Sequence, residues 1–361
     1  MTVPVDLAGG ALGLYSAVGD AFAGRRLGFG RRRAAVAARF AQRLGRDEAA
    51  VAAVWFAALL ADIGLVAIAL PPDASPQRRT LAYADVPLHG AHIVAAFEGA
   101  PPRASDIVRW HREHDDGTGI PDRLRWDGIP ADAAALGIVQ AFLEAVEDPE
   151  QPRDGVEAVF SLEAESGRRF AVDRLRAFRE FVLGANWDAP FADLAFPPID
   201  EDEALRCLAQ RIDARDARPE GRSERLAALG RTLAARLDLD PGRTARLARL
   251  LALGRATEPV PHDDFDPFSR FARDARTALA QRAGAIAASA ERYAGDAPHL
   301  IASAGWYEDG DAQPLAGLLG LLLAVDALNP VDAPRRLAAA SGTQFAPETT
   351  RAYLTLLSEA P

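Results

Sequence analysis

Apolar residues recur at intervals of three and four residues through most of this chain, and this periodicity limits its fold more than any other feature. The repeating segments are residues 33–44, 47–61, 131–147, 203–215, 222–237, 243–253, 270–293 and 314–328. β-Branched residues do not cluster in alternation with polar ones, so no segment predicts a strand. Proline pairs such as Pro71-Pro72 and Pro101-Pro102 end the helical patterns. The sequence therefore predicts an all-α protein.

A break in the helical pattern between residues 186 and 202 divides the chain, because prolines and acidic residues gather there. The sequences on its two sides resemble each other in order. Residues 28–47 resemble residues 221–240, and Ser166 to Phe170 resembles Ser341 to Phe345. Similar alanine and arginine composition would explain only the first match. We therefore expect two related tandem domains, residues 1–195 and 196–361.

Charge and hydropathy restrict the partners. The formal net charge is −10, and an acidic surface repels phosphate backbones, so we expect no nucleic-acid partner. Every basic residue other than histidine is arginine, whose guanidinium does not deprotonate in the working range, which excludes Schiff-base and lysine general-base chemistry. No apolar run approaches the roughly 18 residues of a membrane span. These features predict a cytoplasmic protein that does not bind membranes.

Two short stretches carry recognisable motifs, Leu59-Leu60-Ala61-Asp62-Ile63-Gly64 and Asp116-Gly117-Thr118-Gly119-Ile120-Pro121. With the neighbouring residues 58–65 and 111–121, they resemble the two signatures of the HD-GYP family. The resemblance covers residues 20–185 strongly and residues 203–358 more faintly. It implies a helical bundle in each domain, and two such bundles could pack as a pseudo-dimer. Active members of that family hydrolyse cyclic di-GMP at a site of two or three metal ions.

Most of the metal ligands that the resemblance implies are replaced in this chain. The replaced positions are occupied by Phe29, Ala61, Val86, Arg112 and Ala141. Only Asp62 and His111 remain as remnants of the metal site, which is too few protein ligands for two metal ions. In the second domain, residues 247–257 stand where the first signature belongs and contain no histidine or aspartate. We therefore expect no catalytic residue and no bound cofactor.

The retained residues indicate binding. The candidate ligand-binding residues are Arg112, Glu113, Asp116, Gly117, Gly119, Ile120, Pro121 and Arg153. Two glycines and a proline shape a tight loop. By the resemblance, Arg153 occupies a position that contacts a substrate phosphate. Arg112 could hold a phosphate with two hydrogen bonds, or it could pair with Asp116 or Asp62 and fill the vacated charge site.

The sequence leaves three functions open. The first is a catalytically inactive signalling protein that binds a protein partner, such as a diguanylate cyclase, or senses cyclic di-GMP. The second is a metal-dependent cyclic di-GMP phosphodiesterase with an atypical metal set made of Asp62, His111, Glu113 and His114. The third is a metal-free cyclic di-GMP receptor that uses Arg112 and Arg153. The oligomeric state is also left open.

Overall fold

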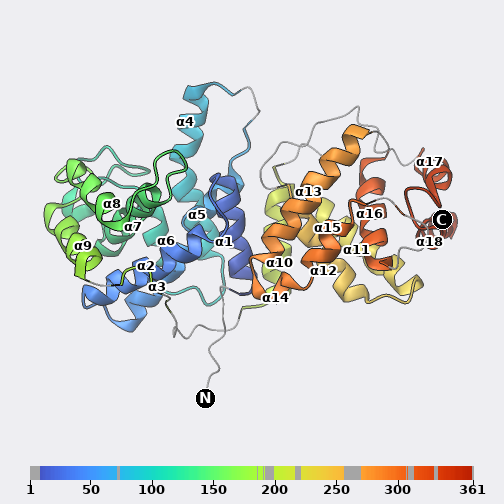
Figure 1. Cartoon of the computed structure of the whole chain (residues 1–361), viewed down its shortest axis with the longest axis horizontal. Helices are drawn as coiled ribbons and strands as arrows, with labels where there is room; N and C mark the ends of the chain where they lie inside the picture. Colours follow the sequence, from blue (N-terminus) through green and yellow to red (C-terminus); the bar gives the residue numbers. More distant parts are fainter. Residues whose placement is uncertain are drawn as a thin grey trace, which may run out of the picture. The chain divides into compact units, whose positions relative to one another are not determined.

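The chain folds into helices joined by loops, and no strand is found among the residues that the structure describes (Figure 1). The structure is a computed structural model that describes residues 9–70, 74–184, 186–189, 191, 199–215, 221–255, 270–305, 307, 313–328 and 332–359. The all-α prediction is confirmed. Within those ranges, every helix is too short or too polar to cross a membrane.

The chain divides into two compact units. One contains Tyr15–Ile199, and the other contains Gly9–Leu14 together with the chain from Asp200 onward. This division falls four residues after the boundary expected behind residue 195. No sequence motif indicates that Gly9–Leu14 groups with the second unit. Within that unit, the Glu201 carboxylate accepts the Ala11 N–H at 2.6 Å, which ties this short segment to the helix that starts at Glu201.

The helices up to residue 184 are α1 (Ala11–Phe22), α2 (Phe29–Arg43), α3 (Glu48–Leu60), α4 (Pro76–Ala84), α5 (Val86–Ala95), α6 (Ala104–Trp110), α7 (Ala131–Val146), α8 (Gly155–Ser161) and α9 (Val172–Gly184), with 3₁₀ turns η1 (Ile63–Ala67), η2 (Trp126–Gly128) and η3 (Leu162–Glu165). Their core is aromatic in part. Phe178 of α9 meets Phe40 of α2 and Phe142 of α7 edge to face, with ring centroids 4.9 and 5.1 Å apart. These contacts hold α2, α7 and α9 together.

The remaining helices are α10 (Glu201–Asp213), α11 (Arg222–Arg236), α12 (Pro241–Leu253), α13 (Arg270–Ala288), α14 (Glu291–Ala294), α15 (Ala297–Ala302), α16 (Pro314–Ala327), α17 (Ala333–Ala340) and α18 (Pro347–Glu359). α12 is buried along most of its length, with Leu247, Leu250 and Leu253 fully buried. The helix expected over residues 270–293 ends at Ala288, and a short helix follows from Glu291.

The two units share one way of starting a helix. Asp20 accepts the Gly28 N–H at 2.9 Å just before α2, and Asp213 accepts the Ser223 N–H at 2.6 Å at the start of α11. Both carboxylates therefore satisfy backbone donors that the first helical turn leaves unpaired. The same local geometry recurs where the sequence repeat was noticed.

The second shared feature is a tight turn near the end of each unit. The Gly167 N–H donates to the Phe170 carbonyl at 2.8 Å, and the Gly342 N–H donates to the Phe345 carbonyl at 2.9 Å. Both glycines have positive φ, 75° and 78°, a conformation that favours glycine. These turns agree with an internal repeat, whereas the pseudo-dimer stays a prediction.

The close approach of η1 to α5 requires a glycine. A methyl group at Gly64 would collide with the Val86 carbonyl oxygen and would lie 2.7 Å from the Gly90 nitrogen. We expect Gly64→Ala to lower the free energy of unfolding by about 1–3 kcal/mol, because backbone atoms must move apart. Gly184→Ala is the matched control, since a methyl group there meets nothing within 4 Å. Urea unfolding of both variants tests this, and equal stabilities would contradict it.

Candidate functional site

Asp62 lies at the end of α3, between the helix and η1, and its side chain is only 1% exposed. Three arginines surround the carboxylate. Arg33 donates to Oδ2 at 2.5 Å, Arg112 donates to Oδ1 at 2.9 Å, and the Arg25 Nε lies 3.6 Å from Oδ2. Both carboxylate oxygens are thus engaged by guanidinium groups. The structure pairs Arg112 with Asp62 rather than with Asp116.

Arg33 is the central cation of this site and was missed in the sequence. It is 1% exposed and also donates to the Ala58 carbonyl at 2.7 Å and to the Gln140 side chain at 2.5 Å. Its guanidinium thereby joins α2, α3 and α7. A signal existed, because Arg33 lies one turn after Phe29 and two turns before Phe40, on the apolar face of α2.

A second ring of polar side chains surrounds this centre. Arg25 donates to Glu144 at 2.7 Å, and the Gln140 amide donates to the same carboxylate oxygen at 2.6 Å. The Arg25 guanidinium also lies over the Phe29 ring, 4.2 Å from its centroid. Gln140 precedes Ala141, which the family resemblance aligns with a metal-binding aspartate, and the Gln140 amide bridges Arg33 and Glu144.

The surroundings of Asp62 and His111 fix their charge states. Burial would raise the pKa of Asp62, but the charges of Arg33 and Arg112 outweigh it and hold the pKa well below its usual range. Burial, assisted by the Arg112 charge, lowers the pKa of His111 to about 3. His111 Nδ1 lies 2.7 Å from the Val108 carbonyl, which can only accept, so the neutral ring carries its proton there.

Asp20 is the second buried acid of the site. Burial raises its pKa to about 6, and the Arg33 charge opposes that rise. Its carboxylate accepts the N–H groups of Gly28 and Gly30 at 2.9 and 3.0 Å. These bonds fix the start of α2 and so the direction in which Arg33 leaves the helix.

The donor set does not fit a metal centre. Guanidinium groups donate to both oxygens of Asp62, and their positive charges repel a metal cation at this carboxylate. The unprotonated nitrogen of His111, Nε2, accepts from the Arg112 Nε at 3.4 Å, which places a positive charge where a metal ion would bind. Over the described ranges, no three His, Cys, Asp or Glu side chains gather closely enough to hold a metal ion. The atypical set that includes Glu113 and His114 is therefore not assembled.

The second motif forms a closed loop after α6. Gly117 has φ 77°, and the Asp116 carboxylate accepts the Thr118 N–H at 2.9 Å and its hydroxyl at 2.6 Å. A side chain at Gly119 would collide with the backbone of residues 113 and 114. The Ile120 N–H donates to the Arg112 carbonyl at 3.1 Å, and Pro121 follows. The loop therefore leads directly back to the arginine that binds Asp62.

The fold finds a counterpart among known proteins. The HD domain family model matches residues 23–173. The chain contains an HD domain. A crystal structure of a cyclic GMP-AMP-specific phosphodiesterase from V. cholerae (V-cGAP3) is similar over 97% of each chain, with a TM-score of 0.68 and 17% identity. At that identity the likeness concerns the fold. No curated protein matches the sequence.

Glu113 holds the HD domain's next loop in place. Its carboxylate accepts the N–H groups of Asp122 and Leu124 at 2.7 and 2.9 Å, and burial raises its pKa. Glu113 therefore binds backbone N–H groups of the loop in this structure, and not the metal ion that the atypical metal set would require. His114 is half-buried and contacts the Thr118 hydroxyl at 3.0 Å.

Removing the Glu113 carboxylate should release this loop. We expect Glu113→Ala to speed hydrogen exchange of the Asp122 and Leu124 amides at least about tenfold, since each bond to a charged acceptor contributes about 1.5–3 kcal/mol. Glu113→Gln keeps one acceptor oxygen, so its exchange rates should lie between those of the wild type and those of Glu113→Ala. Glu180→Ala, on an exposed position of α9, is the control. Unchanged exchange in Glu113→Ala would refute this role.

Among the described residues, Arg153 makes no bond to the Asp62 centre. It is exposed, and its backbone N–H donates to the Ala145 carbonyl at 3.2 Å. No hydrogen bond or ion pair connects its side chain with Arg112 or Asp62 in the described part of the HD domain. The sharing of one receptor site by Arg112 and Arg153 stays a prediction.

The corresponding region of the second unit is apolar. Leu251, Ala252 and Leu253 are buried where the first motif would lie, and Gly254 follows them. The neighbouring cation, Arg255, forms an ion pair with Asp213. Residues 251–255 contain no carboxylate and no imidazole that could bind a metal ion.

Proposed function

We propose that this chain is a catalytically inactive HD-domain signalling protein, which acts by binding a partner and not by hydrolysis. The observation that carries the proposal is the engagement of both Asp62 oxygens by arginines. A site of two metals needs that carboxylate to bridge cations and to help activate water. In this chain a fixed guanidinium takes the cation's place, so the fold keeps its charge balance without the chemistry.

The second unit supports the same proposal. The similarity to the V. cholerae phosphodiesterase extends over 97% of this chain, so both units take part in it. The register that aligns residues 28–47 with residues 221–240 nevertheless places Arg255 of the second unit where the first unit carries Asp62. Because both units have lost acidic metal ligands, neither unit could supply the metal site that the other has lost.

A protein partner is favoured over a nucleotide because Arg112, the cation best placed to hold a phosphate, is already bound to Asp62. Withdrawing it would leave a buried carboxylate with one fewer counter-charge. A signalling enzyme such as a diguanylate cyclase is the first partner to test. Cyclic di-GMP and cyclic GMP-AMP, the latter named for the V. cholerae protein, are the nucleotides to compare.

A hydrolysis assay tests the loss of catalysis. The full chain is incubated with each cyclic dinucleotide and with Mn²⁺, Mg²⁺ or Fe²⁺, and we expect no more product than in buffer alone. Metal analysis of protein purified without chelators should give substoichiometric metal. Turnover that a metal stimulates and that Asp62→Asn abolishes would overturn the proposal.

Calorimetric titration separates the two kinds of ligand. We expect no saturable heat with either nucleotide, and binding of a purified diguanylate cyclase. Saturable nucleotide binding that is lost in the Arg112→Ala, Arg153→Ala double variant would instead establish the metal-free receptor. Binding that this variant retains would place a nucleotide site elsewhere.

A further inference from the structure

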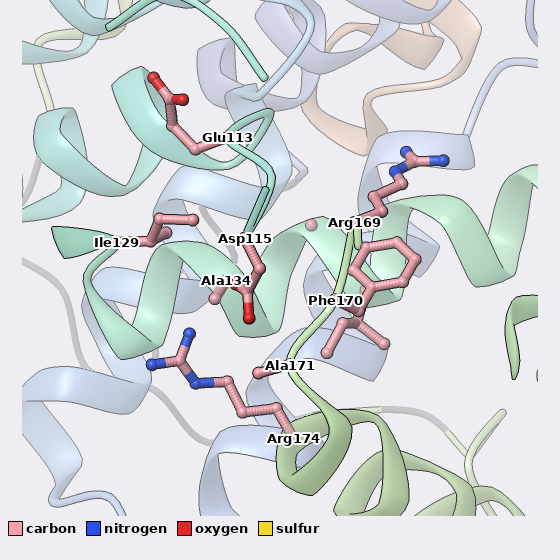
Figure 2. Close-up of a pocket in the computed structure, with 10 residues that line it drawn as sticks. Glu113, Asp115, Ile129, Ala134, Arg169, Phe170, Ala171 and Arg174 are labelled. Carbon is pink, nitrogen blue, oxygen red and sulfur yellow. The ribbon is translucent and has the colours of Figure 1, made fainter. Parts of the chain in front are cut away.

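A small pocket lies in the HD domain beside the second motif (Figure 2). Its volume is about 10 Å³, on the order of the space that one water molecule needs. Asp115 lies in the loop after α6, and Ala134 and Gly137 lie in α7. Arg174 lies in the first turn of α9, and Phe170 lies just before that helix. The walls between the charged groups are mostly apolar.

Two charged side chains point into this pocket from opposite sides. Figure 2 shows the Asp115 carboxylate directed towards the Arg174 guanidinium. In this view, Ala134 lies beside the Asp115 side chain and Ala171 lies below it. Asp115 is 6% exposed, and the Arg174 Nη1 is buried with no hydrogen-bond acceptor. Among the described side chains no direct ion pair joins the two groups. An unmatched buried donor costs about 1–3 kcal/mol, more when it is charged, so the site favours a molecule that supplies the missing acceptor.

The charges on the two walls select that molecule. An anion would be repelled by Asp115, and a cation would be repelled by Arg174. A neutral molecule that accepts from Arg174 and donates to Asp115 satisfies both groups. The volume restricts such a molecule to the size of water. We propose that the pocket is a binding site for one water molecule that bridges the Asp115 carboxylate and the Arg174 guanidinium.

The other charged groups at the pocket do not compete for this molecule. The Glu113 oxygens accept from the backbone of Asp122 and Leu124, and the side chain points away from the gap in Figure 2. The Arg169 guanidinium lies over the Phe170 ring, 4.9 Å from its centroid. Asp115 and Arg174 are therefore the two groups that define the site.

The bridging water gives the second motif a side-chain connection to α9. Two backbone bonds already join these segments, from Asp115 to the Arg169 carbonyl at 3.3 Å and from Asp116 to the Arg168 carbonyl at 2.8 Å. The water adds a third connection, between a carboxylate and a guanidinium. It is a positioning element of the loop and is independent of any ligand of the HD domain.

A crystal structure of the full chain at a resolution that shows ordered water tests the proposal. We expect one water within about 3.2 Å of both the Asp115 carboxylate and the Arg174 Nη1. A direct Asp115–Arg174 hydrogen bond, a dry pocket or an ion in the site would overturn it.

Lengthening the carboxylate gives an independent test in solution. Asp115→Glu adds one methylene, which carries the carboxylate into the water's place, so we expect its thermal midpoint to stay at or above that of the wild type. Asp115→Ala, which leaves Arg174 without any acceptor, should lower the midpoint. Asp127→Glu, at an exposed position, is the control for the longer side chain. A midpoint for Asp115→Glu as low as that of Asp115→Ala would contradict a water-sized gap between the two groups.

Discussion

Arg33→Met should destabilise the first unit by about 3–5 kcal/mol at pH 7, the largest effect that we expect from any single substitution. The variant keeps an unbranched apolar stem but removes the guanidinium that donates to Asp62, Ala58 and Gln140. The 1% exposed Asp62 carboxylate would then depend on Arg112 and Arg25 alone. Removing one member of a buried ion pair is costly because the other charge stays out of water.

Tryptophan fluorescence in urea measures this effect. Four of the five tryptophans, at positions 55, 110, 126 and 187, precede Ile199, so the signal reports mainly on the first unit. Arg32→Met is the matched control. Arg32 is the preceding residue and forms exposed ion pairs with Glu147 and Asp188, which contribute about 0–1 kcal/mol.

A double variant distinguishes lost charge from lost packing. If the cost of Arg33→Met comes from the stranded carboxylate, then adding Asp62→Asn should recover part of it, with a coupling free energy of about 1–3 kcal/mol. Strict additivity of the two substitutions would refute an ion pair as the source. A single-variant effect no larger than that of Arg32→Met would refute the central role of Arg33.

His111 and Asp20 should give the first unit two opposite pH dependences that nearly cancel. His111 has a pKa of about 3 in the fold and 6.5 when unfolded, so its contribution is present above pH 6.5 and is lost as the pH falls towards 3. Asp20 has a pKa of about 6 in the fold and 3.8 when unfolded, so its contribution is present below pH 3.8 and is lost as the pH rises through 6. Each changes the free energy of unfolding by about 1.4 kcal/mol per pH unit inside its window.

Single substitutions should uncover each half. Relative to the wild type, the stability of His111→Gln should rise as the pH falls from 6.5 to 4, because the variant no longer resists protonation. Relative to the wild type, the stability of Asp20→Asn should fall as the pH is lowered from 6 to 4, because only the wild type gains stability from protonation of Asp20. Urea unfolding across pH 4–8 provides both difference curves, in which other carboxylates cancel. Difference curves that stay flat would show that neither group titrates as its burial requires.

Helix positions were readily predictable from the sequence, since three- and four-residue spacing is a local property. α3, α7 and α12 begin and end within two residues of the expected bounds. The two motifs also identified the HD domain, because glycine spacing reflects backbone geometry. At Gly64 and Gly119, a Cβ atom would collide with neighbouring backbone atoms.

The side chains that form the site were harder to predict, because they come together from three different helices. Asp62 and Arg112 were recognised by their register, but Arg33 and Gln140 have no counterpart in a motif of metal ligands. Their role follows from burial, which the sequence shows only indirectly through the face of α2. The loop role of Glu113 was likewise hidden, because a carboxylate that accepts two backbone N–H groups reads in sequence like a metal ligand.

The guanidinium of Arg33 is covalently attached to the helix that it stabilises. A bound metal ion has a dissociation constant and can be removed by a chelator or by scarcity, whereas this cation is synthesised with the chain in a fixed ratio of one to one. The charge balance around Asp62 is therefore complete as soon as α2, α3 and α7 meet. We therefore expect this HD domain to fold to the same state whether metal is abundant or absent, so EDTA should leave its unfolding midpoint unchanged.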